Sequence, residues 1–277
     1  SRFLLAELLF EDRQFEQATA EFESVAYRAP GVIQPTPFAR AADAGYAALL
    51  SLAAQEKAAG DAAARTALQR QAVAGALRFA DTFAGDPRAA AVLTNAAEEL
   101  YTLGDGARAS GVAQRALARQ PAPAPELRRV AWTVVAHQAF ESGAFAPAEA
   151  AYGEVLSLTP SDASGRAALV ERQAAAIYRQ AEAARGAGDA GVAVGHFARI
   201  ASLPALPAQS ALRATAQFDT AAMLMGLKDW ATAAKALEDF RRQFAGHALQ
   251  AEVAPKLALA YLELGRNAQA AAEFEKV

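Results

Sequence analysis

Few residues of this 277-residue chain have the types and spacing that catalysis requires. The run GAGDAG at 186–191 fits the GxGxxG pattern of dinucleotide-binding loops, but such a loop joins a strand to a helix, and this run joins two helical segments. His137, His196 and His247 are spread over the chain, so no two stand at the spacing of a metal site. The chain has no cysteine and no GxSxG, P-loop or HExxH motif. The sequence predicts no enzymatic activity, no cofactor and no metal site.

Composition narrows the classes of partner. The chain has 27 Lys and Arg against 30 Asp and Glu, a net charge of −3, and its arginines are scattered among glutamates. Nucleic-acid-binding proteins instead gather basic residues on one face. Although 53% of the residues are hydrophobic, no apolar run reaches the ~18 residues needed to span a bilayer. We therefore expect neither a nucleic-acid partner nor direct insertion into a membrane.

A short pattern recurs along the chain: a turn, then an alanine, then a large apolar residue and a second one beyond it. It can be read in SGAFAPAEAAYGEVLSLTP, AGDAGVAVGHFARIASLP and LKDWATAAKALEDFRRQFAG, for example. The alanines at this position are Ala18, Ala109, Ala148, Ala193, Ala233 and Ala270, with a weaker seventh at Ala72 found by matching the two Phe-Ala-Gly endings. A helical pattern with a period of roughly 34 to 45 residues is typical of a solenoid, whose units bury their apolar faces by stacking.

The residues around these alanines resemble the tetratricopeptide repeat (TPR). The fourth unit matches the family pattern best, through Trp132, Val135, Ala136, Ala139, Phe145, Ala148, Tyr152, Val155 and Pro160. The resemblance implies an all-α fold, an α-solenoid of about seven helix-turn-helix units forming a right-handed superhelix. It also implies that residues 1–277 form a single solenoid domain, and the missing start methionine and the incomplete end units suggest a segment of a longer protein.

Local signals agree with this interpretation. Glycines stand at one register between the paired helices, where a left-handed residue ends the first helix; they are Gly104, Gly143, Gly188 and Gly265. Carboxylates that could cap the second helix follow at the next register, as Asp105, Asp189 and Asp229. Prolines that would stop the second helices are Pro30, Pro121, Pro160 and Pro204.

One segment interrupts the repeat. Residues 30–37 hold three prolines and a Val-Ile pair, which predicts an extended connector, with a hinge or docking loop as the alternative interpretation. The next unit, 38–83, is rich in alanine and is expected to form longer helices than its neighbours.

The TPR register also predicts a binding surface. In that family the first helix of each unit lines the concave face, and a groove there would hold a peptide or helix of a partner protein. The same positions often carry aromatic residues that only pack between units. The residues at this register are Thr94, Glu98, Tyr101, Thr133, His137, Phe140, Tyr178, Glu182, Arg185, Phe218 and Met225.

Two unit endings narrow the resemblance further. RFADTFAGDP and RRQFAGHALQ use Phe-x-Gly where many repeats use proline, and they are similar to the repeats of bacterial envelope proteins such as the TolA-binding protein and the outer-membrane-assembly lipoprotein. This implies an interaction scaffold in the periplasm or at the outer membrane, with a cytoplasmic location as the alternative. Two other hypotheses stay open: a regulatory or substrate-recruiting segment of a larger enzyme or of a secretion or polysaccharide-export component, and self-association through truncated ends.

Overall fold

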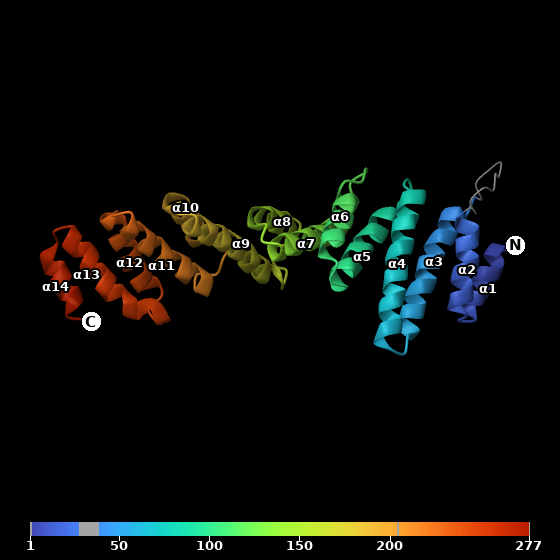
Figure 1. The fold of residues 1–277 in the computed structure, drawn as a ribbon, viewed down its shortest axis with the longest axis horizontal. Helices are drawn as coiled ribbons and strands as arrows, with labels where there is room; N and C mark the ends of the chain where they lie inside the picture. The colour runs from blue at the N-terminus through green and yellow to red at the C-terminus, as the bar shows by residue number, and fades with distance from the viewer. Residues whose placement is uncertain (1, 28–38, 204, 277) are drawn as a thin grey trace. The chain divides into compact units, whose positions relative to one another are not determined.

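The computed structural model describes residues 2–27, 39–203 and 205–276, and within them the chain forms α-helices and one short 3₁₀-helix, with no strand (Figure 1). The predicted connector at 30–37 and the stop at Pro204 lie outside the described residues. Contacts divide the chain into two compact units, 1–138 and 139–277. The boundary falls inside one helix, so this division does not test the predicted single domain, which stays a prediction.

The first unit is built from antiparallel helix pairs. Its helices are α1 (Arg2–Glu11), α2 (Phe15–Ala26), α3 (Ala41–Ala58), α4 (Ala62–Thr82), α5 (Ala89–Thr102) and α6 (Gly106–Leu117), and α7 (Pro125–Glu141) runs across the boundary. Each helix from α1 to α5 packs against its successor in sequence. The helices α3 and α4 are longer than those on either side, as expected for the repeat at 38–83.

The second unit continues the same scheme. Its helices are α8 (Phe145–Ser157), α9 (Arg166–Gly186), α10 (Ala190–Ala201), α11 (Ala211–Gly226), α12 (Trp230–Gln243), the 3₁₀-helix η1 (Ala248–Glu252), α13 (Val253–Glu263) and α14 (Asn267–Phe274). Packing again runs between neighbours in sequence, and α9 also contacts α11, so consecutive first helices lie against each other.

The repeat alanines hold the helix pairs close together. Six of them, all except Ala72, are at most 2% exposed, and each is the fourth residue of the second helix of its pair. A methyl group at this point lets the two helix backbones approach closely, and a larger side chain would overpack the contact.

Ala72 corrects the register of the expanded unit. It is only partly buried and lies ten residues beyond the start of α4, so it is not equivalent to the other alanines at the start of its helix. The C-terminal ends of α4 and α12 are equivalent. Phe79 and Phe240 are both fully buried there, and the ring centroid of each lies 5.3 Å from that of the next aromatic residue, Phe83 in α4's case and Phe244 in α12's. Extra turns in α4 therefore separate the two ends of the repeat pattern.

The turns confirm the repeat independently. The predicted glycines have φ values between 73° and 84°, and Arg13 and Lys228 adopt the same left-handed backbone at φ 62° and 61°. All six residues stand five positions before a repeat alanine. A non-glycine residue in this conformation costs roughly 1 kcal/mol, so packing of the helix pair imposes the turn where the sequence does not favour it.

The predicted caps are confirmed at two of three positions. Asp105 accepts a hydrogen bond from the Arg108 amide at 3.4 Å and Asp229 accepts one from the Thr232 amide at 3.2 Å. The prediction is wrong for Asp189, whose side chain makes no cap hydrogen bond at the start of α10. The left-handed turn at Gly188 orders this helix start without it.

An ion pair with a buried carboxylate joins α12 to α14. Arg241 donates from its two terminal nitrogens to the carboxylate of Glu273 at 2.8 and 2.5 Å, and Lys276 adds a contact at 2.9 Å. Glu273 is only 8% exposed. The hydrogen bonds from Arg241 dominate and lower the pKa of Glu273 from 4.5 to about 2.

This pair predicts a pH-dependent stability. Because the folded pKa is depressed, the stabilisation is present above pH 4.5 and is lost as the pH falls toward 2. Glu273→Gln is expected to lower the free energy of unfolding by roughly 1–3 kcal/mol at pH 7, with screening at the partly exposed Arg241 taken into account. Urea unfolding of both proteins between pH 7 and pH 2 should show this difference shrinking. The exposed Glu275→Gln variant is the control, and a difference that is constant with pH would contradict the assignment.

Candidate functional site

Each of the three histidines contacts a nearby side chain or backbone group. His137 lies against the Tyr101 ring with centroids 5.8 Å apart, and His196 lies 3.2 Å from Arg199 on the same helix. His247 accepts a hydrogen bond from the Leu249 amide at 3.2 Å. In the described part of the chain, no group of three or more histidine and carboxylate side chains could hold a metal ion.

The GAGDAG run lies in the turn between α9 and α10. Gly186 is the last residue of α9, Gly188 has a φ of 84°, and Gly191 is already in α10. The glycines thus serve a helix-turn-helix connection, without the strand that a dinucleotide-binding loop follows.

In the first unit, the predicted surface residues differ in how far solvent reaches them. Glu98 is exposed, and Tyr101, Thr133 and His137 are partly exposed. The Thr133 hydroxyl donates to the carbonyl oxygen of Arg129 at 2.8 Å. Thr94 is 1% exposed, and its hydroxyl donates to the carbonyl of Ala90 at 2.9 Å. Thr94 is thus an interior residue, which corrects its place on the predicted surface.

In the second unit, one hydrogen bond and two ion pairs join the predicted residues of α9 to one another and to α11. Tyr178 donates from its hydroxyl to Oδ2 of Asp219 at 2.8 Å, and Arg185 lies 3.8 Å from the other oxygen of Asp219. Arg185 also lies 3.6 Å from Glu182, which accepts a hydrogen bond from Arg179 at 2.9 Å. We call Tyr178, Glu182, Arg185 and Asp219 the α9–α11 network.

The Tyr178 hydroxyl is a weaker acid than that of an exposed tyrosine. Burial is the main cause that raises the pKa of Tyr178 well above its ordinary value, and the hydrogen bond to the Asp219 carboxylate raises it further. The ring packs edge-on against Phe197, with centroids 5.2 Å apart.

The aromatic residues of the predicted groove are partly interior. Phe218 is 6% exposed and packs edge-on against Phe240 at 5.5 Å, with the Lys256 ammonium 5.5 Å from its ring. Phe140 is partly exposed and packs against Phe145 at 5.5 Å. Met225 packs against the same buried cluster as Phe218. Phe218 belongs to the buried core formed by the C-terminal helices, so it leaves the set of accessible residues.

Asp219 is a member of the network that the sequence did not predict. Its side chain is 18% exposed and connects Tyr178 to Arg185. Its charge could have identified it from the sequence, since Asp219 is the one acidic residue in α11. The repeat register pointed to its neighbour Phe218 instead.

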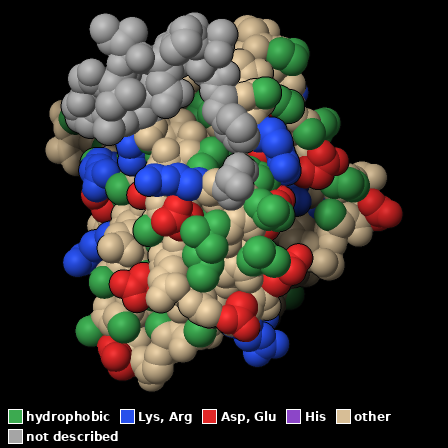
Figure 2. All heavy atoms as spheres, turned by 90° about the vertical axis from the view of Figure 1, so that its right-hand side faces the viewer, with side chains coloured by type: hydrophobic (Ala, Val, Ile, Leu, Met, Phe, Trp, Pro, Cys, Tyr) green, Lys and Arg blue, Asp and Glu red, His purple; other side chains and the backbone are tan. Residues whose placement is uncertain are grey.

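The surface in Figure 2 has basic and acidic side chains interspersed among hydrophobic ones on the face that it draws. Among the described residues, no helix combines the length and apolar character needed to cross a membrane.

Comparisons with known proteins give structural neighbours only. No family model and no curated protein matches the chain. BtubC (BKLC) from P. vanneervenii is 19% identical, with a TM-score of 0.35 and coverage of 76% of this chain and 87% of that chain. YrrB, described as a TPR protein with an unusual peptide-binding site, is 14% identical with a TM-score of 0.38, covering 71% and 88%. A TPR protein from Parabacteroides merdae ATCC 43184 is 17% identical with a TM-score of 0.37, covering 84% and 78%.

The assignment of the fold rests on the chain itself. Six helix pairs share a left-handed turn residue five positions before a buried alanine, and that alanine is always the fourth residue of the second helix. Over the residues that the structure describes, the chain is therefore an all-α repeat protein whose helix pairs resemble the tetratricopeptide pattern.

Proposed function

We propose that this chain is a non-catalytic scaffold that binds a peptide or helix of a partner protein on the face formed by its first helices. The observation that carries the proposal is the α9–α11 network. Its aromatic, acidic and basic side chains come from two consecutive first helices and are joined by one hydrogen bond and two ion pairs. Preorganised side chains of this kind lose little conformational entropy when a partner binds.

The network also has the chemistry of a peptide-binding surface. Arg185 is 43% exposed and Glu182 31%, so both charges face solvent while Asp219 between them is largely covered. Tyrosine and arginine are enriched among the residues that dominate binding energy at protein interfaces. Opposite charges at fixed positions would set the direction of a bound segment.

A location in the bacterial cell envelope is part of the proposal. It is supported by the resemblance of the two Phe-x-Gly endings to the repeats of bacterial envelope proteins. In the structure, the ends of α4 and α12 carry the aromatic pairs Phe79–Phe83 and Phe240–Phe244.

A random-peptide library displayed on phage tests the surface even though the natural partner is not identified. Peptides selected on the wild-type chain are expected to bind Tyr178→Ala about 30-fold more weakly, a loss of roughly 2 kcal/mol, if Tyr178 is a central anchor. Val192→Ala is the matched control, because Val192 is exposed on α10, the second helix of the same pair. Binding is measured by isothermal titration calorimetry.

Folding must be checked in the same proteins, since the Tyr178 ring also packs on Phe197. Tyr178→Phe keeps that packing and removes only the hydrogen bond to Asp219. It therefore distinguishes an effect on the binding surface from an effect on folding. Selected peptides that bind folded Tyr178→Ala as tightly as the wild type would show that partners use another face.

A further inference from the structure

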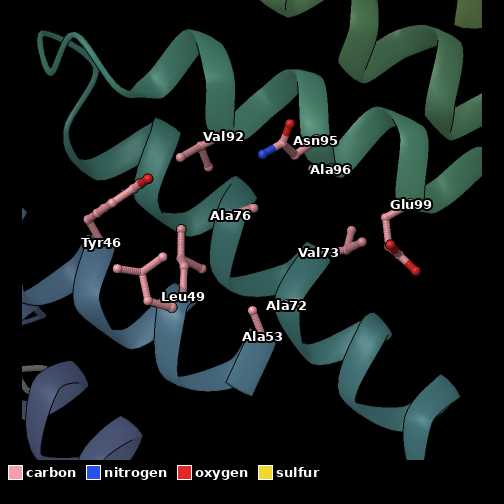
Figure 3. A pocket seen from close by; sticks show the side chains of 11 residues that line it. Tyr46, Leu49, Ala53, Ala72, Val73, Ala76, Val92, Asn95, Ala96 and Glu99 are labelled. Carbon is pink, nitrogen blue, oxygen red and sulfur yellow. The ribbon is translucent and has the colours of Figure 1, made fainter. Parts of the chain in front are cut away.

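A cavity of about 230 Å³ opens between α3, α4 and α5 in the first unit (Figure 3). Its walls are mostly apolar, and its polar groups are the Tyr46 hydroxyl, the Asn95 amide and the Glu99 carboxylate. The apolar residues that line it include Leu49, Ala72, Val73, Ala76 and Val92. Tyr46 and Glu99 stand at opposite ends, with Leu49, Ala76 and Val73 between them (Figure 3).

Glu99 carries an unmet hydrogen-bonding demand. Its Oε1 atom is buried and has no hydrogen-bond partner among the described residues. Burial is the main cause that raises the pKa of Glu99, and repulsion from Glu56 and Glu98 raises it further. A buried polar atom without a partner is destabilising, and more so when it is charged. Because Oε1 is closed to a water-sized molecule in this structure, a donor in the cavity contacts it once the carboxylate turns toward the cavity.

The surrounding charge selects the kind of donor. Glu56 and Glu98 add negative potential at the Glu99 end, and the lining includes no lysine or arginine among the residues that the structure describes. A cation is favoured there over a neutral donor, and an anion is repelled. The rest of the cavity, with its leucine, valine and alanine side chains, suits an aliphatic chain.

The size fits one such chain. An apolar cavity of roughly 150 Å³ holds a benzene molecule, so about 230 Å³ has room for more. Val92 and Glu99 are seven residues apart on α5, a rise of ~10 Å. A chain of about six carbons with a terminal nitrogen is shorter than this distance and has room within it.

We propose that this cavity binds a primary alkylammonium group, with the ammonium at Glu99 and the aliphatic chain along Leu49, Val73 and Ala76. The group is either a free alkylamine or the lysine side chain of a polypeptide. Both donate three hydrogen bonds from a compact cation. This site lies on other helices than the α9–α11 network and does not depend on it.

Calorimetric titration of the whole chain at pH 7 tests the proposal with defined probes. Hexylammonium is expected to bind saturably and at least about tenfold more tightly than hexan-1-ol, with hexanoate weaker still, because the ammonium donates charge-assisted hydrogen bonds to Glu99, the alcohol donates a neutral one and the carboxylate is repelled. A parallel titration with Nα-acetyl-lysine methylamide identifies the source of the group. Tighter binding of hexylammonium indicates a free amine, and tighter binding of the lysine derivative indicates a polypeptide.

Two variants connect binding to the cavity. Glu99→Gln keeps the shape and is expected to weaken hexylammonium about tenfold or more while changing hexan-1-ol binding by less than about threefold. Ala72→Leu projects extra methyl groups from the partly buried rim and is expected to weaken both ligands. Glu126→Gln, an exposed carboxylate on α7 outside the lining, is the matched control.

The proposal is overturned by any of three results. They are no saturable binding of hexylammonium to the wild type, equal binding of hexylammonium and hexanoate, and unchanged hexylammonium binding by Glu99→Gln that circular dichroism shows to be folded. Because the phage-selected peptides are tested on Tyr178, failure here leaves the scaffold proposal standing, and failure there leaves this one standing.

Discussion

Phe240→Ala is expected to lower the free energy of unfolding of the C-terminal repeats by about 3–5 kcal/mol, the usual cost of truncating a fully buried phenylalanine. Phe240 has no exposed surface, and its ring centroid lies 5.5, 5.3 and 5.7 Å from those of Phe218, Phe244 and His247. Alanine leaves a cavity among three aromatic rings on different elements. Those rings cannot all move inward, so the cavity stays partly empty.

The loss should be local, because each repeat is stabilised mainly by its neighbours. Urea unfolding followed by circular dichroism gives the total change, and hydrogen exchange of amides in α11, α12 and α13 locates it. Phe240→Leu keeps most of the volume and is expected to cost clearly less. Phe274→Ala, at a residue that is 54% exposed, is the matched control and should stay within about 0.5 kcal/mol of the wild type. Equal losses for Phe240→Ala and Phe274→Ala would contradict the assigned core.

Gly45→Leu is expected to destabilise the first unit by about 2–3 kcal/mol through overpacking. A Cβ atom at Gly45 would already lie 2.9 Å from Cε2 of Phe83, 3.1 Å from Cδ2 of Phe79 and 3.2 Å from the Tyr27 hydroxyl oxygen. Glycine at this point lets α3 lie directly on the aromatic end of α4. A leucine would push the two helices apart or force the rings out of their rotamers.

The measurement is again urea unfolding, with a second substitution to identify the cause. Phe83→Ala removes one of the obstructing rings, so the double variant Gly45→Leu with Phe83→Ala should lose less stability than the sum of the single losses. Gly111→Leu is the control, since no atom lies within 4 Å of a Cβ at this exposed helical glycine. It should be neutral or slightly stabilising, by the helix propensity of leucine over glycine. Additive losses in the double variant would exclude overpacking against Phe83.

Much of the repeat could be predicted from the residues because it depends on neighbours in sequence. The small residue in each second helix and the turn five positions before it form a local pattern, and six helix pairs confirm it. Where a local signal was weak, tertiary packing decided: Arg13 and Lys228 take the left-handed turn without glycine. Where helix length changed, the local pattern failed, as at Ala72 in the extended α4.

The residues alone specify the all-helical repeat and, in six helix pairs, the register of the contacts, since these follow from periodicity, small residues and turns within each repeat. Packing between helices sets the register of α4 and which register positions face solvent. Thr94 and Phe218 share a register with Tyr178 but are buried, because neighbouring helices of different length and side-chain size cover them differently. The bond from Tyr178 to Asp219 and the cavity at Glu99 likewise join residues of separate helices. Contacts of this kind depend on how the repeats stack, which is a property of packing between units and not of any one unit's sequence.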